Sequence, residues 1–77
     1  MPKIPVVSGK KVIKVLNKIG FETVSQKGSH IKLIRQKRGK VEILIVPKHK
    51  EIHRGTLKNG ILNQIGLEVE EFIKLLK

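Results

Sequence analysis

Apolar residues in the first quarter of the chain recur at the spacing of one helix face. Within residues 8–19 they are Val12, Val15, Leu16 and Ile19. A stripe at i, i+3, i+4 and i+7 is typical of an amphipathic helix. Ser8 precedes the stripe as a candidate N-cap, and Gly20 follows it as a candidate C-cap. The pattern therefore predicts a helix over residues 8–19.

The pattern then changes from helical spacing to alternation. Three segments alternate or are rich in β-branched residues: 21–27, 30–36 and 41–46. Pro47 ends the third segment, because proline cannot donate to a strand ladder. The short, glycine-containing connections between the segments allow only antiparallel neighbours. We therefore predict three strands in an antiparallel meander.

Helical spacing returns after a polar loop over residues 48–54. Thr56 is a candidate N-cap and Gly66 a candidate stop for a helix whose apolar stripe is Leu57, Ile61, Leu62 and Ile65. A last helix is predicted over residues 68–76, with an inward face of Val69, Phe72, Ile73 and Leu76. The order α-β-β-β-α predicts one α+β domain over residues 1–77, in two layers, with the helices on one face of a three-stranded antiparallel sheet.

Alternation also predicts which side chains lie on the uncovered face of this sheet. If Ile31 and Leu33 pack under the helices, His30, Lys32 and Ile34 lie on the opposite face. The third strand admits two registers, because both of its faces are apolar. In one register Leu44 and Val46 are exposed beside His30 together with Glu42, and the helices cover Val41, Ile43 and Ile45. In the other register the two sets change places. Exposed aliphatic side chains beside a basic site usually mark a partner surface.

Charge narrows the choice of partner. Seventeen Lys and Arg residues against six acids give a net charge of +11. Residues 1–67 hold 15 bases and 3 acids (+12), whereas residues 68–77 hold 2 bases and 3 acids (−1). The basic residues are therefore part of the predicted folded region rather than of a tail. This region has too few glutamates for the surface ion-pair networks that would otherwise explain so many lysines. The net positive charge therefore favours a polyanionic partner: nucleic acid, an anionic membrane surface or an acidic protein, with RNA as the leading candidate.

Composition excludes several classes of protein. There is no cysteine for a disulfide or a thiolate metal site, and no aspartate for a Ser-His-Asp triad. No apolar run approaches the roughly 20 residues of a membrane span, and residues 1–9 lack the layout of a signal peptide, so we expect a cytoplasmic protein. The only aromatic residues, Phe21 and Phe72, fall on core-facing positions. Base stacking is therefore not expected, and RNA contacts should go to phosphate and sugar.

Three histidines are the candidates for acid-base chemistry near neutral pH. His30 follows the Gly28-Ser29 turn and begins a strand, which gives a catalytic group a rigid mount. From composition alone, a surface histidine beside a turn is the commoner case. His49 and His53 have an i, i+4 spacing, but the acid of an HExxH site is missing. We expect phosphate contacts from these loop histidines, and neither a metal nor a cofactor.

Several motifs then occur in order along nearly the whole chain. They are Gln26-Lys27-Gly28-Ser29-His30, Val46-Pro47-x-His49, Gly55-Thr56-Leu57 and Gly66-Leu67-x-x-Glu70-Glu71-Phe72. Together they resemble the HicA (YcfA-like) toxin family. The stretch from Leu57 to Gly66 is one residue longer than the family's pattern, and Gly60 marks the extra residue. We expect this to affect the shape of that helix rather than the chemistry.

The resemblance implies a double-stranded-RNA-binding-domain-like fold and a ribonuclease that cleaves mRNA and arrests translation. It also implies a cognate HicB-type antitoxin. The family's catalytic histidine, the one in Gly-Ser-His, corresponds to His30. We predict RNA contacts from Lys27, Gly28, Ser29, Lys32, Arg35 and His49.

The leading interpretation is a metal-independent endoribonuclease in which His30 is the general base for the ribose 2′-OH. The runner-up is a non-catalytic module that binds A-form RNA through its phosphates. A helix-turn-helix DNA binder built from residues 56–76 ranks last, because its second helix opens with three acids that phosphates repel.

Overall fold

The computed structural model describes residues 3–77 and begins its regular structure with helix α1 (Gly9–Lys18). Ser8 is the N-cap, and its side-chain oxygen accepts a hydrogen bond from the Lys11 backbone N–H (3.2 Å). Gly20 follows the helix with φ +100°. The predicted helix and its N-cap are confirmed, with bounds that differ by one residue at each end. The C-cap is Ile19 rather than the predicted Gly20, which is the next residue.

Three strands form one antiparallel sheet in the order β1-β2-β3, which confirms the predicted meander. They are β1 (Glu22–Lys27), β2 (His30–Lys37) and β3 (Lys40–Pro47). β1 contains a bulge between Thr23 and Ser25. The central strand is therefore β2, which begins at His30, and both of its neighbours are edge strands.

The second helical region begins earlier than the sequence predicted. It comprises α2 (Arg54–Leu57), a π-helical turn η1 (Lys58–Leu62) and a 3-10 turn η2 (Asn63–Ile65). The N-cap is His53, whose side chain makes no capping hydrogen bond, so the assignment of Thr56 as N-cap was wrong. Gly66 ends the region with φ +67°, as expected for a left-handed C-terminal residue. The last helix is α3 (Val69–Leu76).

A π-helical turn lies in the segment where we expected Gly60 to alter the shape of the helix. Gly60 is at the centre of η1. A π turn holds one more residue than an α turn, and a helix can contain one without displacing the buried side chains on either side. Leu57, Ile61 and Leu62 remain buried across it. The π turn thus changes the helix locally and leaves these three apolar side chains in the core.

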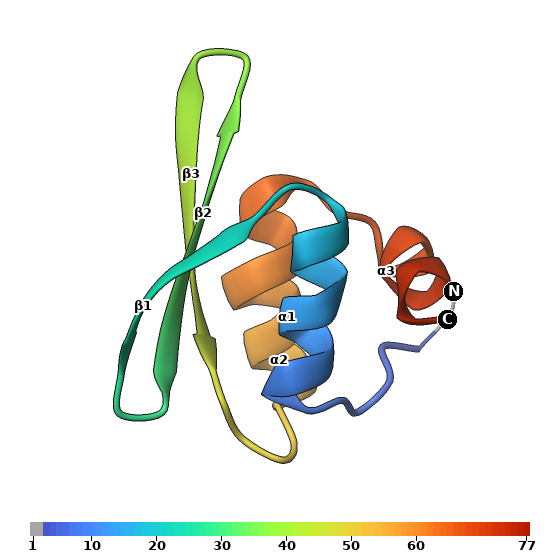
Figure 1. Ribbon diagram of the computed structural model, residues 1–77. Helices are drawn as coiled ribbons and strands as arrows, with labels where there is room; N and C mark the ends of the chain where they lie inside the picture. The colour runs from blue at the N-terminus through green and yellow to red at the C-terminus, as the bar shows by residue number, and fades with distance from the viewer. Residues whose placement is uncertain (1–2) are drawn as a thin grey trace.

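The elements form an α+β fold with all helices on one side of the sheet, as predicted (Figure 1). α1 and the α2-η1-η2 region cover one face, and α3 packs against α1 on the side away from the sheet. The largest fully buried side chains of the core are those of Phe21, Phe72, Leu16, Leu33, Leu57, Ile61 and Leu62. The β2-β3 hairpin extends beyond the helices, and the other face of the sheet carries no helix (Figure 1).

The register of β3 differs from the one that would expose Leu44 and Val46. These two side chains are in the core, opposite Leu33 and Ile31 of β2. The uncovered face instead carries Val41, Ile43 and Ile45, which are 55%, 54% and 48% exposed. The reason is the two-residue turn between Lys37 and Lys40, which pairs odd-numbered residues of β2 with even-numbered residues of β3. Residues that lie directly opposite each other share a face.

Candidate functional site

Three segments far apart in the sequence meet at the end of the sheet where β2 begins. The backbone N–H of Lys48 donates to the carbonyl oxygen of Ser29 in the β1-β2 turn (2.6 Å). One residue later, the His49 carbonyl oxygen accepts from the N–H of Gly9 at the start of α1 (2.9 Å). Main-chain hydrogen bonds therefore join the turn before His30 to the loop that follows β3 and to the first turn of α1.

Gly9 makes this close approach possible, and sequence reasoning did not single it out. A Cβ at this position would collide with the Pro47 carbonyl oxygen and would lie 2.9 Å from Lys48 Cα. No side chain fits there, so the helix start contacts the end of β3 directly. The only sequence signal was the Ser8-Gly9 pair at a helix start, which is common for many other reasons.

His30 is the first residue of β2 and lies on the uncovered face. It pairs with Lys27 of β1 on one side and with Pro47 of β3 on the other, and its side chain is exposed. Gly28 has φ +61°, which permits the tight turn, and the Gln26 side-chain amide donates to its carbonyl oxygen (3.0 Å). The imidazole is thus held on a paired backbone while it remains open to a ligand.

Lysines surround His30 and have no acidic partners. Lys27, Lys32 and Lys48 are exposed, and none of them forms an ion pair within the described residues 3–77. Lys27 lies opposite His30, Lys32 is the next residue of β2 on the same face, and Lys48 follows the pair formed by His30 and Pro47. Unpaired cations on both sides of the imidazole can bind a phosphate. The accessible imidazole can then transfer a proton to or from a group next to that phosphate.

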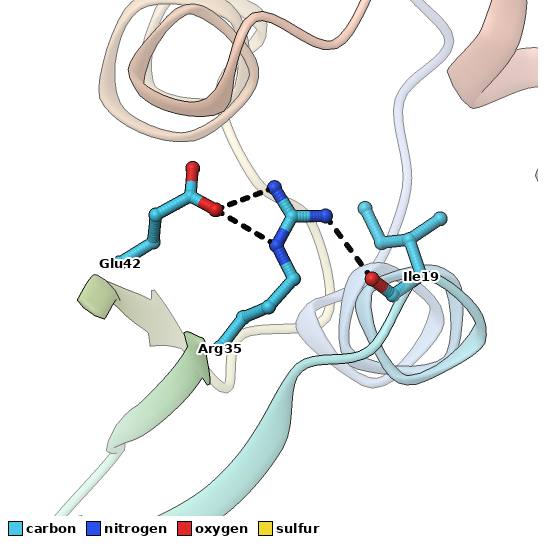
Figure 2. Close-up of polar contacts among 3 residues, drawn as sticks. All are labelled: Ile19, Arg35 and Glu42. Atoms are coloured by element: carbon cyan, nitrogen blue, oxygen red, sulfur yellow. Dashed lines mark hydrogen bonds and ion pairs between the residues drawn. The ribbon is translucent and has the colours of Figure 1, made fainter. Parts of the chain in front are cut away.

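Arg35, which the sequence suggested as an RNA contact, lies on the helix-facing side of the sheet (Figure 2). Its guanidinium donates to Glu42 Oε1 from Nε (2.8 Å), and Nη2 lies 2.7 Å from the same oxygen. Nη1 donates to the Ile19 carbonyl oxygen (3.0 Å), and the group stacks 4.6 Å from the centroid of the Phe21 ring. The side chain is 11% exposed. All these contacts tie the sheet to the end of α1, so we leave Arg35 out of the cluster around His30.

The remaining predicted residues divide between this cluster and its margin. Ser29 belongs to it through its hydrogen bond to Lys48, and His49 through its bond to Gly9. The His49 side chain is exposed. His53 lies further along, at the start of α2, and within residues 3–77 no three His, Cys, Asp or Glu residues are grouped closely enough to hold a metal. The candidate site is therefore a basic surface around one histidine.

A groove on the described part of the molecule lies away from this site. It has a volume of about 680 Å³ and lies on the helical side, between Ile4, Arg54 and Val69. Arg54 there donates to the Ile4 carbonyl oxygen (2.8 Å) and so holds the N-terminal segment against the helices. His30 does not line this groove, so the groove and the candidate site are separate.

Fold and site together define a small α+β domain with a basic sheet face centred on one exposed histidine. The profile of the family described as the HicA toxin of bacterial toxin-antitoxin systems matches residues 9–67, which is more than half of the 77 residues. The chain belongs to the HicA toxin family, whose members function with a cognate antitoxin. Searches of curated proteins and of solved structures found no match. Within residues 3–77, no helix has both the length and the apolar character needed to span a membrane.

Proposed function

We propose that this toxin is a cytoplasmic endoribonuclease that cleaves mRNA and uses His30 as its catalytic residue. The observation that carries the proposal is the position of His30 in Gly28-Ser29-His30: exposed, at the first position of the central strand, and surrounded by unpaired lysines. A rigid backbone holds a catalytic group in place better than a loop does. The family's pattern has its catalytic histidine at this position.

The chemistry requires one base and a cationic surface. Neutral His30 removes the proton from a ribose 2′-OH, and the 2′-oxygen attacks the adjacent phosphorus. The bond from phosphorus to the 5′-oxygen breaks, which leaves a 2′,3′-cyclic phosphate on one fragment. The 5′-oxygen of the other fragment takes a proton from water or from the imidazolium formed in the first step. Lys27 and Lys32 stabilise the negative charge that develops on the phosphate.

RNA binding extends the site along the segments that the hydrogen bonds join. Gly28 and Ser29 bring a side-chain-poor turn next to His30, so a phosphate can approach the backbone closely. His49 continues the surface from the loop after β3. No aromatic side chain is available on this face, since Phe21 and Phe72 are both buried. Recognition therefore rests on phosphate and sugar rather than on base stacking.

The test is cleavage of a defined mRNA by the purified protein in EDTA, with analysis of the product ends. We expect cyclic phosphate and 5′-hydroxyl ends, and a 10²- to 10⁴-fold lower rate for His30→Ala, as is usual on removal of a general base. The free energy of unfolding should change by less than about 0.5 kcal/mol because the side chain is exposed. His53→Ala is the matched control, an exposed histidine outside the cluster.

Two results would contradict the proposal. Undiminished cleavage by a folded His30→Ala protein would exclude this residue as the base. Tight binding of duplex RNA that stays intact would favour the second candidate function, a non-catalytic module that binds A-form RNA. The unpaired charge of this face supports both functions, and only the product analysis separates them.

We further propose that a HicB-type antitoxin covers the same face of the sheet. Val41, Ile43 and Ile45, which we call the aliphatic patch, are about half exposed on an edge strand beside Lys32. An exposed aliphatic patch of this kind is typical of a partner surface. An acidic partner that buries the patch would also shield His30 and neutralise the lysines around it.

A further inference from the structure

The tip of the β2-β3 hairpin carries positive charges that form no ion pair within residues 3–77. The tip consists of Lys37, Arg38, Gly39 and Lys40, three cations in four residues, and all four are exposed. It extends past the helices into solvent (Figure 1). Within residues 3–77 the only ion pair is that of Arg35 with Glu42, so no acid neutralises the tip. Like charges held this close together repel each other, and they favour an anionic ligand.

Arg38, one of the three cations of the tip, has a backbone conformation that is unfavourable for arginine. Arg38 has φ +53° and Gly39 has φ +77°, and Arg38 is the only residue other than glycine with a positive φ among those described. A two-residue hairpin turn of this kind favours Asn, Asp or Gly at its first position. Asn and Asp tolerate this conformation because of their short polar side chains, and glycine because it has no Cβ. Arginine has neither advantage. An outlier of this kind often marks a functional position.

The tip lies at the far end of the strand that begins with His30. β2 runs from His30 to Lys37, so at roughly 3.3 Å per residue its two ends are about 23 Å apart. On the uncovered face, the side chains between them are Lys32, Ile34 and Gln36. An RNA strand whose cleaved phosphate lies at His30 can therefore follow this face and reach the tip, whereas a single dinucleotide cannot.

We propose that the hairpin tip is a second RNA-binding site, which binds phosphates of the strand that is cleaved at His30. This inference rests on the proposed function and deepens it. The tip acts as an anchor about 23 Å from the chemistry. It holds long RNA on the protein, and it has no part in the cleavage step itself. Affinity for long RNA and cleavage of a minimal substrate should therefore be separable.

A simpler role for the same cations is protection of the sheet. Lysine at the end of an exposed edge strand hinders pairing with a second copy of the chain. Such a role requires positive charge but no RNA contact. The two explanations differ in their effect on RNA affinity and on its salt dependence.

The test compares two triple variants that remove the same charge. Lys37→Gln/Arg38→Asn/Lys40→Gln neutralises the tip, and asparagine suits the positive φ at residue 38. Lys3→Gln/Lys74→Gln/Lys77→Gln neutralises three exposed lysines away from the tip. Lys74 is in α3, Lys77 is its C-cap, and Lys3 lines the groove next to this helix. Binding of a long single-stranded RNA is measured in the His30→Ala background, so that the RNA stays intact. Cleavage of a dinucleotide is measured with His30 present.

The slope of log K against log salt concentration should be less steep by about 2 in the tip variant. Each of the three lost phosphate contacts on a single strand contributes about 0.7 to this slope. Compared with the parent protein, the variant's Kd for long RNA should therefore rise far more at about 0.1 M salt than at about 1 M salt. Its kcat/KM on the dinucleotide should stay within twofold. The variant near the termini should leave the slope and the dinucleotide cleavage unchanged.

Equal slopes for the tip variant and its parent would overturn the inference, and self-association of the tip variant would then assign the cations to edge protection. A tip variant that loses dinucleotide cleavage in the folded state would also contradict it, because the tip would then act at the cleavage step. Failure of the proposed nuclease is a separate result. In that case the protein with His30 intact cleaves no RNA at all, while the change in slope still reports whether the tip binds.

Discussion

The two faces of the sheet are built from similar side chains and have different roles. Leu44 and Ile43 are consecutive residues of β3, yet Leu44 is 3% exposed and Ile43 is 54% exposed. The helix-facing side is closed by packing, and its one charged pair, Arg35 with Glu42, is tied to the end of α1 (Figure 2). The uncovered side has unpaired cations beside exposed aliphatic groups. The helix-facing side thus maintains the fold, and the uncovered side remains open for ligands.

The largest expected difference between the faces is in stability. Leu44→Ala should lower the free energy of unfolding by about 2–5 kcal/mol, because it leaves a cavity in a closed core. Ile43→Ala, one residue earlier, should cost less than about 1 kcal/mol. Urea unfolding followed by far-UV circular dichroism measures both, since the chain has no Trp or Tyr for fluorescence. Equal costs would mean that the uncovered side is packed in solution.

A smaller effect is expected for the charged pair of the helix-facing side. Arg35→Ala removes the ion pair, the bond to Ile19 and the stacking on Phe21, and should cost about 2 kcal/mol. Glu42 is 25% exposed and regains some water, so the loss stays below that of a fully buried pair.

Two measurements accompany the Arg35 variant. Gln36→Ala, at the next position of β2, should change the stability by less than about 0.5 kcal/mol. Under conditions where Arg35→Ala is folded, its RNA affinity should equal that of the parent protein. A specific loss of RNA binding would instead make Arg35 part of the RNA surface.

The smallest expected effect concerns the antitoxin and tests whether the uncovered side serves two ligands. Ile43→Ser/Ile45→Ser should weaken antitoxin binding about tenfold, which is 1.4 kcal/mol, because burial of the aliphatic patch is lost. RNA cleavage without antitoxin should stay within threefold. Calorimetric titration of the cognate antitoxin and the mRNA cleavage assay give the two values.

Charge reversal at Lys32 is the complementary variant. Lys32 lies opposite Ile45 and on the same face as His30, so Lys32→Glu should weaken RNA cleavage and antitoxin binding together. Unchanged antitoxin affinity together with lost cleavage would mean that inhibition does not involve covering this part of the site.

Much of the fold follows from local patterns. Helical spacing from Val12 to Ile19, with Ser8 and Gly20 at its ends, was enough to predict α1. Alternation placed Ile31 and Leu33 in the core and His30 on the uncovered face. These patterns predict the structure because a strand with a single apolar face can bury that face in only one orientation relative to the helices.

The register of β3 required more than alternation. Both of its faces are apolar, so burial alone favours neither. The turn at Arg38 and Gly39 contained the missing information, because a two-residue loop fixes which residues of β2 and β3 lie opposite each other.

By itself the sequence determined the order of the elements, the basic charge and the place of His30 at the start of a strand, since these depend on neighbouring residues. Only the tertiary structure decided that Arg35 pairs with Glu42 on the helix-facing side, because an arginine in a basic sequence is expected at the surface until its partner is known. It also decided that Gly9 contacts Pro47 beside the candidate site. Gly9 and Pro47 are distant in the chain, and Arg35 is fixed on the helix-facing side by its contacts with Ile19 and Phe21 as well as with Glu42. No local pattern reports contacts between separate elements.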